Sequence, residues 1–146
     1  MNISAELAKL SQFMPVDKLQ PKVDTVLRFI TEPVTHVLKS TALGGDAPVL
    51  SALFVVTQRL ICEVRLAEGA QKFDFVSKTS IKNYRVRLWD QEISEGGVVR
   101  AKYELADIEL SHELSSSFVT NFTYAGTARD EWITEIKSAI PVESVT

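Results

Sequence analysis

The residues with the clearest chemical potential form a basic segment in the second half of the chain. Residues 75–89 contain four cations, no acid and a terminal tryptophan: Lys78, Lys82, Arg85, Arg87 and Trp89. Residues two apart in a strand share a face, so Arg85, Arg87 and Trp89 are predicted to project together. Cations beside an aromatic ring can bind a phosphate, an anionic lipid headgroup or an acidic peptide. We take these five as candidate binding residues. The alternative is a solvated outer face balanced by acids on neighbouring strands, namely Glu63 and Glu104.

The residue types that most often carry catalysis or bind metals are few and scattered. Cys62 shares one face of an alternating segment with Leu60 and Val64, so burial should raise the pKa of its thiol and make it a poor nucleophile. His36 and His112 lack the spacing of a metal-ligand pair. The chain contains neither a P-loop nor a G-x-G-x-x-G motif. The sequence therefore predicts a protein that is not an enzyme, with no catalytic residue, cofactor or metal.

Composition and charge limit the classes of partner. The 146 residues are 45% hydrophobic and 24% charged, and the net charge of −3 gives no general attraction to nucleic acid. No apolar run approaches the roughly 20 residues of a transmembrane helix. Glu6 and Lys9 interrupt the N-terminal segment, unlike a secretory signal. The single cysteine, Cys62, excludes a disulfide within the chain and favours a reducing, cytoplasmic location.

The first 33 residues are predicted to form one or two helices. Apolar residues recur there at intervals of three and four, and the second stripe consists of Leu19, Val23, Val26 and Ile30. Pro21 is expected in the first turn of the second helix. We divide the chain into an N-terminal helical extension, residues 1–33, and a domain, residues 34–146. The extension either packs on that domain or serves as an arm for oligomerisation or partner docking.

Beyond the helical extension the pattern changes to short strands. Leu50–Leu66 is the most apolar segment, and we predict two antiparallel strands that turn at Thr57–Gln58. Residues 40–48 are expected to form a loop because they contain several turn residues. Further alternating segments lie at 73–76, 82–89, 99–105 and 118–124. A bulge is expected near Ala106 and a turn at residues 115–117.

The C-terminal segment returns to a helical period. Trp132, Ile136 and Ile140 fall on one face, Thr127 is a candidate cap, and Pro141 ends the helix. About seven short strands flanked by helices indicate the α+β class. The sequence therefore predicts a small antiparallel sheet system that the final helix closes or plugs.

Three features together resemble the pleckstrin-homology-like (PH-like) superfold, especially its bacterial PH and GRAM-type branches. The first is the strand–turn–strand sequence LFVVTQRLI of residues 53–61. The second is the aromatic strand Phe73–Phe75, which Ile81 follows, and the third is the terminal helix with Trp132. The likeness covers roughly residues 34–141. It implies a bent antiparallel β-barrel of about seven strands with a C-terminal capping helix, preceded here by the N-terminal helices.

Domains of this superfold are mostly binding modules for phosphoinositides, other lipids or protein surfaces, and some bacterial members are thought to assemble as rings. The resemblance therefore implies a non-enzymatic protein-binding or self-assembly module. The alternative is peripheral binding of an anionic lipid or membrane surface through the basic strand Lys82–Arg87. Such domains grip inositol phosphates with several cations in the first inter-strand loop. Residues 39–48 offer one lysine and one aspartate there, which argues against that ligand.

Overall fold

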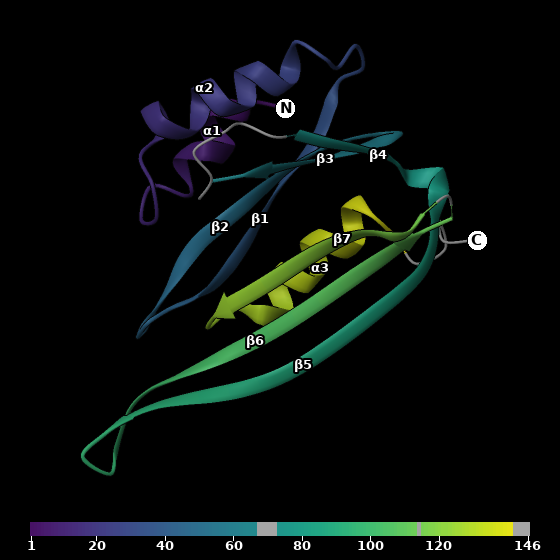
Figure 1. The fold of residues 1–146 in the computed structure, drawn as a ribbon. Coiled ribbons are helices and arrows are strands. Elements are labelled where there is room, and N and C mark those ends of the chain that lie inside the picture. The colour runs from purple at the N-terminus through teal and green to yellow at the C-terminus, as the bar shows by residue number, and fades with distance from the viewer. Residues whose placement is uncertain (67–72, 114, 142–146) are drawn as a thin grey trace.

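The computed structural model describes residues 1–66, 73–113 and 115–141, and for residues 115–119 it describes the backbone alone. Within these ranges it contains three α-helices and seven β-strands (Figure 1). In chain order they are α1 (Ile3–Ala8), α2 (Val16–Leu27), β1 (Val34–Gly44), β2 (Ala47–Thr57), β3 (Leu60–Arg65), β4 (Phe73–Ser77), β5 (Ile81–Glu95), β6 (Val98–His112), β7 (Ser115–Gly126) and α3 (Arg129–Ala139). The prediction of an α+β protein is confirmed.

The strands form two antiparallel sheets and not one closed barrel. The first sheet has the order β1-β2-β3-β4, and the second has the order β5-β6-β7. The sheets meet where β1 approaches β7. Thr41 Oγ1 donates to Ala125 O at 3.1 Å and accepts from Ala125 N at 2.9 Å, while Ser40 Oγ accepts from Thr123 N at 3.1 Å. Side-chain hydrogen bonds therefore join the sheets at this edge.

The main core lies between the two sheets and α3. Phe54 of β2 meets Phe122 of β7, with ring centroids 4.1 Å apart. Trp132 of α3 is 2% exposed, and its indole Nε1 donates to Lys39 O at 2.9 Å. The Trp132 ring lies 5.4 Å from that of Tyr124. The predicted inward tryptophan on a terminal helix is thus confirmed.

A second core lies on the opposite face of the first sheet, beneath α1 and α2 (Figure 1). Leu19 and Val23 of α2 are fully buried in it, as are Leu53 of β2 and Cys62 of β3. Alternate residues of β2 enter the two cores, so both faces of this strand are covered. That is why the strand reads as a nearly continuous apolar run. Of the two roles that the sequence left open for the helical extension, packing on the sheet is the one the structure shows.

Glu32 fastens the end of the helical extension to the turn between β2 and β3. Its carboxylate accepts hydrogen bonds from the Thr57 hydroxyl, from Arg59 N at 3.2 Å and from Arg59 Nε at 2.9 Å. Thr57 Oγ1 also accepts from Leu60 N at 2.9 Å, and β2 and β3 pair antiparallel, which confirms the predicted turn at Thr57–Gln58. The hydrogen bonds from Thr57 and Arg59 hold the pKa of Glu32 below its usual value of 4.5.

Replacing Glu32 with glutamine should remove a pH-dependent part of the stability. A carboxyl whose pKa is lowered by folding stabilises the protein above its unfolded pKa, and this stabilisation is lost as the pH falls through the folded pKa. Urea unfolding at pH 7 should show Glu32→Gln less stable than the wild type. The difference should begin to shrink below about pH 4.5 and should vanish below the lowered pKa of the folded state, where the wild-type carboxyl is neutral too. An equal difference at pH 7 and pH 3 would show that the charge of Glu32 is not what matters.

The loop predicted at residues 40–48 is instead part of a hairpin. β1 continues to Gly44 and β2 begins at Ala47, which leaves a two-residue turn. Gly45 has a φ of +77°, a left-handed conformation that glycine adopts without steric cost. The turn residues therefore mark a tight reversal, and pairing between the strands extends them farther than their composition suggested.

The helix starts also differ from the predictions. α2 begins at Val16, so Pro21 lies inside the helix and not in its first turn. α3 has Ala128 at its N-cap position without a side-chain cap, so Thr127 does not cap it. No helix in the described ranges combines the length and apolar character that crossing a membrane requires.

Two predictions for the second sheet are wrong as well. β6 runs without a register shift through Ala106, and the two irregularities in its pairing with β5 fall instead between Ile81 and Asn83 and between Ile93 and Ser94. Residues 115–117, predicted as a turn, begin β7. The change of apolar phase near Ala106 arises because the inner face of β6 enters the main core from that residue onward.

Candidate interaction surface

β5 is the edge strand of the second sheet over all of its 15 residues. Among the described strands only β6 pairs with it, and its other side is open in Figure 1. β7 pairs with β6 only from Glu104 onward, so the end of β5 and the start of β6 form a two-stranded ribbon that projects past the other elements (Figure 1). The free side of β5, which we call the β5 edge, exposes main-chain groups that can pair with another chain.

Three of the five candidate residues lie together on the face of β5 that points away from the main core. These are Arg85, Arg87 and Trp89, which we call the outer stripe. Arg87 Nη2 lies 2.5 Å from Asp107 Oδ2, and Arg85 Nη1 lies 3.7 Å from Glu109 Oε2. The guanidinium carbon of Arg87 is 5.7 Å from the centroid of the Trp89 ring. The predicted basic and aromatic stripe therefore exists, and each of its two arginines faces an acid across the ladder.

The acids that balance the outer stripe are Asp107 and Glu109, and not Glu63 and Glu104, which make their polar contacts elsewhere. Asp107 is 6% exposed. The hydrogen bond from Arg87 to this carboxylate raises the pKa of the guanidinium. Sequence reasoning missed this pair because cross-strand neighbours depend on the register of the ladder, which no local pattern reveals.

The two candidate lysines lie outside the outer stripe. Lys78 is in the short 3₁₀ turn before β5, and its Nζ donates to Ala139 O at 2.9 Å, at the C-terminal end of α3. Partial burial lowers the pKa of Lys78. Lys82 is exposed at the start of β5. Lys78 therefore caps a carbonyl group at the C-terminal end of α3, whereas Lys82 is exposed to solvent.

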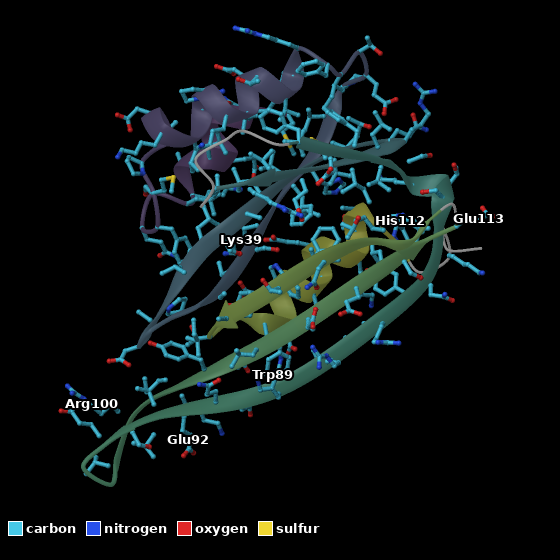
Figure 2. All side chains as sticks on the ribbon, viewed as in Figure 1. Lys39, Trp89, Glu92, Arg100, His112 and Glu113 are labelled. Carbon is cyan, nitrogen blue, oxygen red and sulfur yellow. The ribbon has the colours of Figure 1, made fainter. Side chains whose placement is uncertain are left out.

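The opposite face of β5 exposes apolar surface. Tyr84 packs against the main core, and its hydroxyl donates to Ile140 O at 3.4 Å. Farther along the strand, Val86 is 48% exposed and Leu88 is 51% exposed, while Trp89 on the outer face is 43% exposed. Figure 2 labels Trp89. Alternation identified the apolar face correctly, but it gives no sign of where the covering elements end. Apolar side chains are thus exposed on both faces of a strand that has an unpaired edge.

Cys62, His36 and His112, the residues whose types most often take part in catalysis, are each buried or partly buried. Cys62 is fully buried, and burial raises the pKa of its thiol to about 12. His36 lies 3.2 Å from Ser138 Oγ through Nε2, but its Nδ1 contacts the Thr35 hydroxyl at 3.0 Å where a hydrolytic triad has a carboxylate. Burial lowers the pKa of His36. Among the described residues no group of three or more His, Cys, Asp or Glu is placed to hold a metal ion.

His112 has a structural position at the end of β6 (Figure 2). It is buried, and its ring nitrogens lie 3.3 Å from Ser80 Oγ and 2.8 Å from Thr120 Oγ1. The ring thereby connects β7 with the 3₁₀ turn that leads into β5. Burial lowers the pKa of His112, so the ring is held neutral at pH 7.

The centre of β5 combines exposed side chains on both faces with an unpaired edge. Arg87 and Trp89 lie on one side of the strand, Val86 and Leu88 lie on the other, and the unpaired β5 edge runs between them. An extended segment placed along this edge would pair with the main chain and contact side chains on both faces. In comparisons with known proteins, no family model, no curated protein and no solved structure matches this chain.

Proposed function

We propose that this protein is a non-enzymatic module that binds a polypeptide strand, its own or that of a partner, along the β5 edge. The observation that carries the proposal is a 15-residue edge strand whose centre exposes Val86, Leu88 and Trp89. Natural sheets usually keep their edges short, twisted or covered, because an open edge pairs with other chains. A long open edge with apolar residues at its centre fits a surface that a partner covers.

We further propose that the chain has a PH-like architecture. The order of seven strands in two antiparallel sheets, followed by a helix with an inward Trp132, supports this proposal. A binding role on such a scaffold rests on the β5 surface itself, because a shared fold does not determine function.

Peripheral binding of anionic lipid has less support. Arg85 and Arg87 each face an acid, and Lys78 donates to a carbonyl at the end of α3. Lys82 is the one candidate cation without such a contact among the described residues. Attraction to a negatively charged surface grows with the number of unpaired cations near it, so this face offers a weak electrostatic drive.

A photo-activatable phenylalanine derivative in place of Leu88 tests the proposed function in the native cells. The matched control carries the same derivative in place of Lys18, an exposed residue of α2. Irradiation should cross-link the chain to a polypeptide through position 88 and not through position 18, because only the β5 edge holds a partner. Mass spectrometry of the cross-linked peptides identifies the partner and the residues that it contacts.

Two results would contradict the proposal. One is the same set of adducts from positions 88 and 18, which would indicate random collision. The other is adducts to lipid alone at position 88, which would favour the membrane alternative. An adduct that disappears after Val86→Asp, in a variant that keeps its circular dichroism spectrum, would confirm that the apolar centre of β5 makes the contact.

A further inference from the structure

The charges along β5 are separated by sign. Residues 82–87 contain three bases and no acid, whereas residues 90–95 contain three acids and no base. The exposed apolar residues Val86, Leu88 and Trp89 lie at and near the middle. Ion pairs with β6 offset part of this charge, but Lys82 and Glu92 form no ion pair with any residue that the structure describes. The β5 edge is therefore basic at one end, apolar at the centre and acidic at the other end.

This order is symmetric about the middle of the strand. Each base has an acid at the same distance on the other side of the midpoint between Leu88 and Trp89: Lys82 and Glu95, Arg85 and Glu92, Arg87 and Asp90. A second copy of the strand, placed antiparallel beside the first, brings basic half against acidic half at both ends. A parallel copy would place like charges together, which is unfavourable.

We propose that the partner of the β5 edge is a second copy of this chain, bound antiparallel about a two-fold axis near Leu88. This inference rests on the proposed function, since it names the occupant of the same surface. The axis stands perpendicular to the sheet, so the two three-stranded sheets join into one sheet of six strands. The outer stripes of the two copies then lie on the same face, with Arg87 of each copy close to Trp89 of the other.

The electrostatic attraction acts between the basic half of one β5 strand and the acidic half of the other copy, and not through individual ion pairs. Directly opposite residues of an antiparallel pair point to the same face, whereas Arg85 and Glu92 point to opposite faces of β5. At the centre, Leu88 approaches its own symmetry mate and each Val86 lies diagonally beside the Leu88 of the other copy. Apolar surface that is about half exposed in the single chain becomes covered there.

The other open edge in the ribbon does not suit such a pairing. β6 lacks a neighbour on one side from Val98 to Tyr103, a segment that carries Arg100 and Lys102 and no acid. A two-fold pairing of this segment would place cations of the two copies against each other. Edge strands commonly carry charges of one sign, which repel a copy of themselves. On β5 both signs are present and separated, so the charges orient a second copy.

Cysteine cross-linking tests the position of the axis. Leu88→Cys should form a disulfide-linked dimer under mild oxidation of the full-length chain, because residues opposite each other in an antiparallel pair lie within disulfide reach. Val49→Cys is the matched control, since Val49 is a strand residue with 45% exposure in the other sheet. The native Cys62 is fully buried and does not compete. The dimer should form at least about tenfold faster at position 88 than at position 49.

Charge reversal at the unpaired positions tests the orientation without breaking an internal ion pair. In sedimentation equilibrium at low salt, Lys82→Glu and Glu92→Lys should each raise the dimer dissociation constant by about tenfold. An equimolar mixture of the two variants should associate more tightly than either alone, because one half-contact is again fully complementary. Lys18→Glu, which changes the net charge equally but on α2, should leave the dissociation constant unchanged.

The outcomes separate this inference from the proposed function. A wild-type chain that sediments as a monomer at every concentration, or a dimer that cross-links as fast at position 49 as at position 88, overturns the self-pairing. If the photo-cross-linker at position 88 still captures another polypeptide in cells, the β5 edge remains a binding surface for a different partner. If it captures none, both proposals fail. A dimer that forms at position 88 and is restored by mixing the charge variants confirms the inference.

Discussion

Replacing Trp132 with alanine is expected to lower the free energy of unfolding by about 3–5 kcal/mol, the usual cost of removing a large buried aromatic side chain. Trp132 is 2% exposed and stands between the two sheets, with its ring 5.4 Å from that of Tyr124. Its indole Nε1 is also a hydrogen-bond donor to Lys39 O at 2.9 Å. Alanine would leave a cavity and a buried carbonyl without its partner, so both costs act in the same direction.

Urea denaturation followed by far-ultraviolet circular dichroism measures this effect. Trp132→Phe retains most of the ring but loses the donor to Lys39, so it should cost less than alanine and still about 1–3 kcal/mol. Trp89→Ala is a matched control, because this second tryptophan is 43% exposed and should cost less than about 1 kcal/mol. Equal losses for Trp132→Ala and Trp89→Ala would show that α3 does not close the main core.

Substitution in α2 should be almost as damaging, although this helix lies outside the predicted domain. Leu19 is fully buried against the outer face of the first sheet, and Leu19→Ala should cost about 2–5 kcal/mol. Deleting residues 1–30 should abolish cooperative unfolding. The reason is that it would expose an apolar sheet face that includes Leu53, Val55 and Val64.

The control for this prediction is Lys18→Ala, which changes an exposed residue of the same helix and should alter the free energy of unfolding by less than about 0.5 kcal/mol. Thermal unfolding by calorimetry compares the variants with the truncated chain. A truncated chain that stays monomeric and unfolds in one sharp transition would contradict the expectation. It would show that residues 34–146 fold independently and that the helical extension has a separate purpose.

The sequence predicted most of the secondary structure because local periodicity records which face of an element is covered. The α+β class, the turn at Thr57–Gln58, the buried Cys62 and the inward Trp132 all follow from alternation, helical spacing or turn residues close together in the chain. Apart from the bulge expected at Ala106 in the middle of β6, the errors in secondary structure lie at element ends. Gly44 and Ala47 continue a hairpin where composition indicated a loop, since pairing between strands overrides local preference.

The candidate site was predicted in part, and the missing part depends on the tertiary structure. From spacing alone, Arg85, Arg87 and Trp89 were expected to share one face of a strand, and they do. That Asp107 and Glu109 neutralise the two arginines follows from the register of β5 and β6, which distant residues decide. That Leu88 is exposed follows from its place on the edge strand, because the main core at this level covers Ala106 of β6 and Tyr124 of β7 but not Leu88.

The residue types that make up this surface could therefore be predicted from the sequence, but the exposure of the strand's free edge could not. Residue order by itself determined the alternation along Ile81–Glu95 and the separation of its bases from its acids. Only the tertiary structure decided that this strand is an edge, because strand neighbours are chosen by long-range pairing and core packing that local patterns do not encode. The separated charges of β5 can orient a partner strand only because this edge is unpaired.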